Sequence, residues 1–254
     1  MNQDIFNLTK IPERSQKPRK SGATMVMDKG LSLAAARDLA ESFHPLIDYI
    51  KLGFGTSYVT PNLQEKINIY KAAGIDVYYG GTLFEAYIAR NQFQDYQRLL
   101  DKTGITMAEV SDGSLEMPHD KKCEYITELA KSVTVLSEVG SKDDEKIIPP
   151  YEWIEQMQAE LAAGSTRVIA EARESGTVGI FRGTGEVRSG LVAEIIRKVP
   201  MDKIIWEAPL KSQQVWFLKL YGPDVNLGNI APEEIIALET LRIGLRGDSF
   251  NFFL

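Results

Sequence analysis

The feature that most constrains the fold of this chain is a repeated pair of segments. Short apolar or β-branched runs recur along the 254 residues; each ends in a polar or glycine cluster and is followed by a helix-like stretch. Strands that alternate with helices form parallel sheets with right-handed crossovers. The predicted strands are residues 24–27, 48–52, 76–79, 108–110, 133–136, 167–170, 204–206 and 225–227; the amphipathic stretches between them include residues 33–43, 63–73, 83–100, 121–131, 151–162, 189–198 and 211–221.

Eight such units predict a single-domain (β/α)8 TIM barrel. About 250 residues is the usual size of this fold, and eight units close a barrel more naturally than they fill an open sheet. The rival architecture, an open doubly wound sheet, would need a glycine fingerprint after the first strand, and DKGLS at residues 28–32 is not one. No change in composition marks a linker. We therefore predict an N-terminal arm at residues 1–22 and a barrel with a C-terminal helix and tail at residues 23–254.

Composition and charge exclude several classes of function. A net charge of −6 argues against a general nucleic-acid binder. The chain has no apolar stretch approaching the roughly 20 residues of a membrane span, and its first 20 residues lack the apolar core of a secretory signal. The single cysteine, Cys123, cannot form an intramolecular disulfide, fits a reducing cytoplasm and reads as a bystander. We expect a cytoplasmic protein whose basic run at residues 17–20 is a solvated arm.

Charged residues are concentrated where the predicted strands end, which is the active-site face of a barrel of this kind. Charges in apolar strands are costly unless they are paired or bind a metal, so their recurrence predicts a functional mouth. Glu109, Glu138 and Glu171 lie on neighbouring strands and suit a hard cation such as Mg²⁺, whereas zinc is disfavoured because no cluster of His and Cys is present. Further strand-end residues are Asp28, Lys51, Glu85, Lys142, Arg173, Glu207 and Asn229.

Two glycine-containing loops are candidate phosphate sites. Residues 181–190 (FRGTGEVRSG) are basic and lead into a helix, whose N-terminal N–H groups could cradle an anion. Residues 226–229 (NLGN) follow the last predicted strand, and barrels often bind phosphate with their last loops. Lysines and arginines at the same mouth predict an anionic, phosphorylated substrate. The individual candidates in these loops are Arg182, Gly183, Gly185, Arg188, Gly228 and Asn229.

Eight short motifs are distributed along the chain from about residue 22 onward, and most of them lie at the ends of predicted strands. They are KLGFGTS (51–57), GGTLFE (80–85), EVSDG (109–113), SEVGSKD (137–143), EARESG (171–176), WEAP (206–209), NLGNI (226–230) and LRGD (245–248). In their order and spacing they resemble the phosphosulfolactate synthase family. The first 20 residues carry no part of the resemblance.

The resemblance implies a Mg²⁺-dependent addition of sulfite to phosphoenolpyruvate that gives (2R)-O-phospho-3-sulfolactate, a step that leads to coenzyme M in archaea and to sulfolactate in bacteria. It also implies a homo-oligomer, with a trimer as the suggested state. The addition needs a general acid at the phosphate-bearing carbon. We expect Lys142 to be that acid and Lys51 to be the second choice, or else an electrostatic partner of sulfite or the carboxylate. Arg173, Arg182 and Arg188 are candidates for binding phosphate and sulfite.

Two alternatives remain open at this level. A Schiff-base aldolase would use Lys51 or Lys142 as its nucleophilic amine. The second alternative is a non-catalytic barrel, because plant relatives of the same family are heat-stress proteins without this clear enzymatic role. The strand-end acids and lysines are all present in this chain, which favours the synthase.

Overall fold

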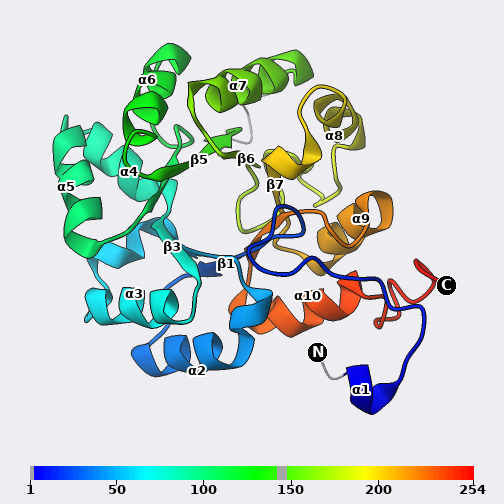
Figure 1. The fold of residues 1–254 in the computed structure, drawn as a ribbon. Coiled ribbons are helices and arrows are strands. Elements are labelled where there is room, and N and C mark those ends of the chain that lie inside the picture. Colours follow the sequence, from blue (N-terminus) through cyan, green and yellow to red (C-terminus); the bar gives the residue numbers. More distant parts are fainter. Residues whose placement is uncertain (1–2, 142–147) are drawn as a thin grey trace.

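Parallel strands and the helices between them close into a barrel (Figure 1). The computed structural model describes residues 3–141 and 148–254. The strands follow one another in the order β3-β2-β1-β8-β7-β6-β5-β4, so the predicted (β/α)8 fold class is confirmed. The strands are β1 Thr24–Asp28, β2 Tyr49–Leu52, β3 Asp76–Tyr79, β4 Met107–Val110, β5 Thr134–Val139, β6 Arg167–Ala170, β7 Ile204–Glu207 and β8 Leu227–Ile230.

The helices surround the strands, and the short α1 stands apart from the barrel near the N-terminus (Figure 1). Among the helices of the described residues, none combines the length and apolarity needed to cross a bilayer. The helices are α1 Gln3–Phe6, α2 Leu33–Phe43, α3 Leu63–Ala72, α4 Gly81–Ile88, α5 Phe93–Thr103, α6 His119–Leu129, α7 Pro150–Ala163, α8 Ser189–Ile196, α9 Lys211–Tyr221 and α10 Ile235–Arg242.

Two predicted elements were placed wrongly. The single helix expected at residues 83–100 is two helices, α4 and α5, because the chain turns between them at Asn91, whose φ of 56° lies in the left-handed region that asparagine tolerates. The last strand was expected at residues 225–227 but begins at Leu227. Asn226 precedes it and uses its side chain in place of a backbone ladder: its Oδ1 accepts a hydrogen bond from the N–H of Ala23 at 3.0 Å, and its Nδ2 donates to the carbonyl of Ile204 at 3.0 Å.

The strands bury side chains on both faces, and the barrel interior forms a small core of its own. Successive side chains of a strand point to opposite faces, so residues two positions apart share a face. The residues of this interior core lie two positions before the charged residues at the strand ends, on the same face of the strand. Leu136 lies before Glu138 in this way, and Ile205 lies before Glu207. The apolar layer therefore supports a charged layer above it. Its members are Ala23, Met25, Tyr49, Tyr78, Met107, Leu136, Ile169 and Ile205.

The seam between β3 and β4 is closed by side chains. These strands are the two ends of the strand order, and in the described part of the chain no backbone ladder joins them. Glu109 of β4 accepts a hydrogen bond from the N–H of Gly81, at the start of α4, at 2.6 Å. Glu85 of α4 in turn accepts hydrogen bonds from the Ser111 hydroxyl and from the N–H of Ser114. Helix α4 thus fastens β4 to the end of β3.

The N-terminal arm covers the base of the barrel, opposite the charged strand ends. Its basic run (residues 17–20) was predicted to be solvated; Pro18 and Lys20 are exposed, whereas Lys17 and Arg19 are half-buried against the base. The Lys17 ammonium donates to the carbonyls of Ile47 at 2.6 Å and Gly74 at 2.8 Å, which precede β2 and β3. Arg167, the first residue of β6, donates to two carbonyls within the run. The run is bound because these carbonyls and side chains lie beyond the ends of the strand ladders and need partners.

A buried ion pair anchors this arm and gives a test of its contribution. Arg14 is 6% exposed and pairs with Glu239 of α10 at 3.0 Å and with Asp224 at 2.5 Å. Arg14→Met should lower the free energy of unfolding by about 3–5 kcal/mol, since it leaves a buried carboxylate unpaired. Arg98→Met, which removes an exposed pair with Asp95, should cost no more than about 1 kcal/mol. Urea unfolding followed by circular dichroism measures both, and equal losses would contradict the anchoring role.

Candidate active site

Lys51 of β2 lies among buried carboxylates at the C-terminal end of the barrel. Its Nζ lies 3.0 Å from Glu109 Oε1, 3.1 Å from Glu138 Oε2 and 3.2 Å from Glu207 Oε1. The four side chains are at most 8% exposed. Burial by itself would lower the pKa of Lys51, but the three carboxylates outweigh it and hold that pKa well above its usual range. Lys51 is therefore an ammonium ion.

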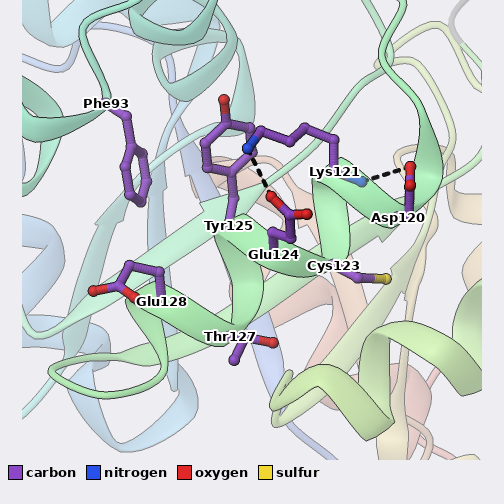
Figure 2. Close-up of a pocket in the computed structure, with 8 residues that line it drawn as sticks. All are labelled: Phe93, Asp120, Lys121, Cys123, Glu124, Tyr125, Thr127 and Glu128. Carbon is purple, nitrogen blue, oxygen red and sulfur yellow. Dashed lines mark hydrogen bonds and ion pairs between the residues drawn. The ribbon is translucent and has the colours of Figure 1, made fainter.

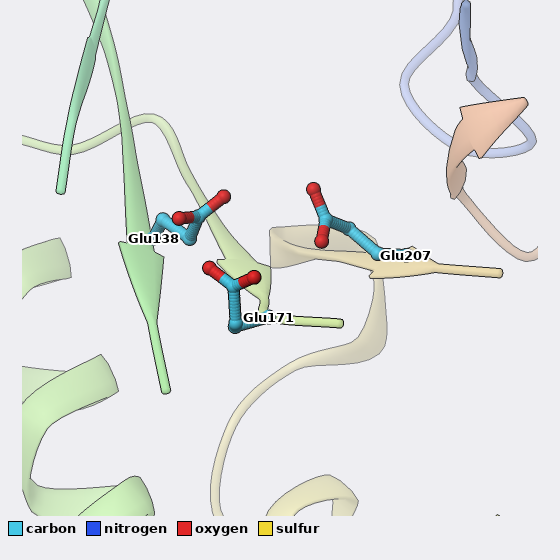
Figure 3. Close-up of side chains that lie close together, drawn as sticks. All are labelled: Glu138, Glu171 and Glu207. Atoms are coloured by element: carbon cyan, nitrogen blue, oxygen red, sulfur yellow. The ribbon is translucent and has the colours of Figure 1, made fainter. Parts of the chain in front are cut away.

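Three of the carboxylates converge on one point. Glu138 of β5, Glu171 directly after β6 and Glu207 of β7 each offer an oxygen, and these oxygens lie within 4.8 Å of one another (Figure 3). Glu109, Glu138 and Glu207 contact the ammonium of Lys51, and Glu171 lies beside Glu138 and Glu207. A converging donor set made only of carboxylate oxygens fits a hard divalent cation such as Mg²⁺.

Hydrogen bonds from neighbouring loops fix the carboxylates. Glu207 Oε2 accepts from the N–H of Ala172 at 2.8 Å, while its other oxygen meets Lys51. Burial raises the pKa of Glu207 to about 8; Lys51 opposes this rise, and the carboxylates of Glu138 and Glu109 add to it. Burial likewise raises the pKa of Glu109. The crowding of these acids is what a bound cation would relieve.

Two glycines allow Glu171 to approach this closely. Gly140, just after β5, has φ 140°, and a Cβ built there would lie 2.4 Å from the Cβ of Glu171. Gly179 has φ 70°, and a Cβ there would lie 2.0 Å from the carbonyl oxygen of Glu171. Both positions combine a left-handed backbone with a contact that no side chain can share. The glycines of SEVGSK and of the loop after β6 therefore shape the site.

A cavity of about 360 Å³ opens above this cluster. Asn229 of β8 lines it, with φ 55°; its Nδ2 donates to the carbonyl of Ala172 at 3.0 Å, and its buried Oδ1 accepts no hydrogen bond from the described residues. Arg173 is exposed at the rim. Arg173 can therefore offer a positive charge to an anionic ligand above the carboxylates. The lining residues include Met27, Lys51, Phe54, Thr82, Glu109, Glu138, Glu171, Arg173, Ser175, Glu207 and Asn229.

The structure brings together one part of the predicted set. Lys51, Glu109, Glu138, Glu171, Arg173 and Asn229 all line the cavity. Gly228 lies in the barrel wall, where a Cβ would meet the Met25 methyl carbon at 2.6 Å, so its small size serves packing. Lys142 lies outside the described residues.

The predicted phosphate loop is not part of this cavity lining. A bridge between Phe181 and Val187 folds it into a hairpin. Several backbone amides are used within the loop: Arg182 N–H donates to the carbonyl of Glu186 and Gly185 N–H to that of Arg182, both at 2.8 Å. Binding of phosphate by Arg182, Gly183, Gly185 and Arg188 stays a prediction.

Glu207 was recognised as a strand-end charge but not as a member of the carboxylate group. The predicted metal set was Glu109, Glu138 and Glu171; the group that converges contains Glu207 in place of Glu109, which is engaged by Lys51 and Gly81. The sequence contains a pattern from which the position of Glu207 could have been predicted. Ile205 and Glu207 share a face of β7, as Leu136 and Glu138 share a face of β5.

A second depression lies on the outer side of the barrel, against α6. It has about 680 Å³ and is lined by residues such as Phe93, Lys121, Cys123 and Tyr125 (Figure 2). The Cys123 sulfur lies 4.0 Å from His119 Nε2, and burial raises the pKa of its thiol, which keeps it protonated. That Cys123 is a bystander stays a prediction.

Comparison with known proteins decides the family. The family model of (2R)-phospho-3-sulfolactate synthase (ComA) matches residues 12–248. The chain belongs to the phosphosulfolactate synthase family. The resemblance drawn from the strand-end motifs is confirmed.

Individual relatives agree with this membership. The phosphosulfolactate synthase of Methanothermobacter thermautotrophicus is 45% identical over 94% of this chain and 95% of its own length. That of Bacillus subtilis is 41% identical over 94% of this chain and 96% of its own length. Protein HEAT-STRESS-ASSOCIATED 32 of Arabidopsis thaliana is a more distant relative, 23% identical over 91% of this chain and 88% of its own length.

Two solved structures with similar folds are distant in sequence. A 3-hexulose-6-phosphate synthase gives a TM-score of 0.53 at 16% identity, over 85% of this chain and 99% of that one. A DHDPS from Cyanidioschyzon merolae gives 0.55 at 12% identity, over 89% of this chain and 82% of that one. At such identities the likeness concerns the barrel fold alone.

Because Glu207 and Glu109 have different contacts, their contributions to metal binding can be distinguished by experiment. Glu207→Gln should weaken Mn²⁺ binding by at least about tenfold, because it removes a converging oxygen charge. Glu109→Gln should weaken it less, by under about threefold, because Glu109 contacts Lys51 and Gly81 instead. Electron paramagnetic resonance of free Mn²⁺ measures both affinities. A larger loss in Glu109→Gln would restore the set predicted from sequence.

Proposed function

We propose that this chain catalyses the addition of sulfite to phosphoenolpyruvate, giving (2R)-O-phospho-3-sulfolactate, with Mg²⁺ held by Glu138, Glu171 and Glu207. One observation carries the proposal: in a member of this family, three buried carboxylates converge beside the ammonium of Lys51, under a cavity at the strand ends. Bound Mg²⁺ would stabilise the negative charge that develops at the carboxylate of phosphoenolpyruvate as sulfite attacks the methylene carbon.

The side chains at the cavity divide the remaining work. Lys51 supplies a fixed positive charge for the anionic substrates, and Glu109 keeps it in place across the seam. Arg173 at the rim can form paired hydrogen bonds with phosphate or sulfite. Asn229 lines the cavity and is held by its hydrogen bond to the carbonyl of Ala172. Because the cluster is buried, its charges are weakly screened and act strongly on a bound ligand.

The same geometry argues against a Schiff-base aldolase at Lys51. A Schiff base forms from a neutral amine with open access to a carbonyl carbon. Lys51 Nζ instead lies within 3.2 Å of three carboxylates. Borohydride with a ketone substrate should therefore leave the mass of the peptide that contains Lys51 unchanged.

Purified protein tests the reaction directly. With sulfite, phosphoenolpyruvate and Mg²⁺, mass spectrometry should detect phosphosulfolactate. EDTA should abolish turnover, and Mg²⁺ or Mn²⁺ should restore it. Full activity without metal would reject the carboxylate site, and absence of product would reject the reaction. A non-catalytic barrel would also show no thermal shift with phosphoenolpyruvate or Mg²⁺.

The proton donor is proposed to be Lys142. In the sequence it follows Gly140 and Ser141, just after β5, and residues after strand ends carry the chemistry in barrels of this kind. Lys142→Met should lower kcat by a factor on the order of 10²–10⁴ while phosphoenolpyruvate still binds, since only proton delivery is lost. Lys51→Met should harm substrate affinity at least as much as kcat. Steady-state kinetics and calorimetry distinguish the two; a near-native kcat for Lys142→Met would make Lys51 the first candidate.

The resemblance further suggests a homo-oligomer, with a trimer as the expected state, in the cytoplasm, and a product that feeds coenzyme M or sulfolactate synthesis. Light scattering after size-exclusion chromatography would determine the number of subunits.

A further inference from the structure

A second buried lysine lies behind the carboxylate group. Lys122 of α6 is 1% exposed, and its ammonium meets three oxygens: the carbonyl of Glu138 at 2.6 Å, Asp112 Oδ1 at 2.8 Å and Glu160 Oε1 at 2.8 Å. An ammonium has three N–H donors, so these three contacts use its full capacity. The contacts come from three further parts of the barrel: β5, the loop after β4 and helix α7. Lys122 therefore ties α6 to the strand ends.

The contact with Glu138 occurs where the strand ladder stops. The last register pair between β4 and β5 joins Val110 to Ser137. Glu138 is the next residue of β5, and its carbonyl accepts from Lys122 at a position that β4 no longer reaches. Its side chain, on the interior face, contacts Lys51 and belongs to the carboxylate group. A restraint on this carbonyl is therefore a restraint on one of the converging carboxylates.

The charge of Lys122 is compensated away from the cavity. Glu160 of α7 is fully buried and also contacts His119 Nε2 at 3.1 Å. Burial by itself would lower the pKa of Lys122, but Glu160 and Asp112 outweigh it and raise that pKa above its usual range. A buried ion pair of this kind is weak evidence for stability, because replacing it with apolar side chains is often neutral. The hydrogen bond from Lys122 to the Glu138 carbonyl of β5 indicates another role for this lysine.

Lys66 of α3 provides the matched comparison. It is also 1% exposed, and its ammonium binds a buried carboxylate, Asp28 Oδ2, at 3.0 Å. Asp28 meanwhile accepts from the N–H groups of Gly30 and Leu31, in the turn after β1. Neither Lys66 nor Asp28 lines the cavity. The two lysines thus share burial and a carboxylate partner, and differ in whether they touch a strand that carries the metal group.

We propose that Lys122 is a positioning residue for the active site: by holding the end of β5 it sets the place of the Glu138 carboxylate. The inference rests on the proposed metal role of Glu138. Partners behind the ligands of metal sites typically change metal affinity or activity by about 10- to 100-fold when they are removed.

The first experiment compares Lys122→Met with Lys66→Met. Mn²⁺ affinity is measured by electron paramagnetic resonance, and kcat and KM for phosphoenolpyruvate by steady-state assay. Lys122→Met should weaken Mn²⁺ binding by about 10- to 100-fold and lower kcat. Lys66→Met should leave both within about threefold, although both variants lose thermal stability, because each leaves a buried carboxylate unpaired. Equal effects of the two variants on Mn²⁺ affinity would overturn the proposal.

A second variant separates positioning from folding. Lys122→Met with Glu160→Met removes both charges of the buried pair, which is often tolerated. It still lacks the donor to the Glu138 carbonyl. Its Mn²⁺ affinity should stay about tenfold or more below that of the unmodified protein even where stability is regained. Recovery of affinity along with stability would show that Lys122 acts through folding alone.

The proposed function fails in a distinguishable way. If the unmodified protein binds no Mn²⁺, the metal site is rejected whatever the lysine variants do. The positioning role is then decided by kcat: a loss in Lys122→Met and in the double variant, but not in Lys66→Met, supports it, and parallel values in all three reject it.

Discussion

The attraction between the Lys51 ammonium and the carboxylates around it organises the C-terminal end of this barrel. The interaction takes place among side chains that are almost fully buried, where charges are weakly screened and an unbalanced one is costly. Lys51 offers one positive charge to Glu109, Glu138 and Glu207, and Glu171 adds a further acid beside them. The convergence of carboxylate oxygens makes this end of the barrel suited to a cation. Most other contacts in the site hold these side chains in position.

Backbone N–H groups on neighbouring elements fix the positions of these carboxylates. The N–H of Gly81 fixes Glu109 from α4, and the N–H of Ala172 fixes Glu207 from the loop after β6. Glu171 reaches its place because glycines, not larger residues, stand at the close contacts around it. Each carboxylate of the cluster is thereby oriented by a segment other than its own strand. Such cross-support limits how far the acids can relax apart when they repel one another.

Buried charge in this chain has two uses. The ion pairs of Arg14 with Glu239 and of Lys66 with Asp28 lie away from the cavity, and they join the arm to the base and one helix to a turn. The cluster at Lys51 instead gathers several carboxylates under a cavity. Location and convergence therefore distinguish a structural pair from a candidate site, although both consist of the same residue types.

The sequence by itself determined the fold class and the face on which chemistry occurs. Eight strand-helix units have one natural closure, and the acids and lysines at strand ends must then share one rim. It also identified Lys51, Glu138, Glu171, Arg173 and Asn229 as neighbours, although they are spread over some 180 positions of a 254-residue chain. Alternation along each strand accounts for this success, because it is a local property.

Only the tertiary structure decided which acids converge. Glu109 and Glu207 are equivalent in sequence, as acids near the ends of short strands, yet the hydrogen bond from Gly81 draws Glu109 to the seam and leaves Glu207 with the group of three. The hairpin that uses the amides of residues 181–188, the docking of the basic arm on the base and the reach of Lys122 to the Glu138 carbonyl are also contacts between distant segments. Periodicity places a side chain on a face of its own strand. Which partner it meets there depends on the twist, closure and loops of the whole barrel, and these are fixed only when all strands are assembled.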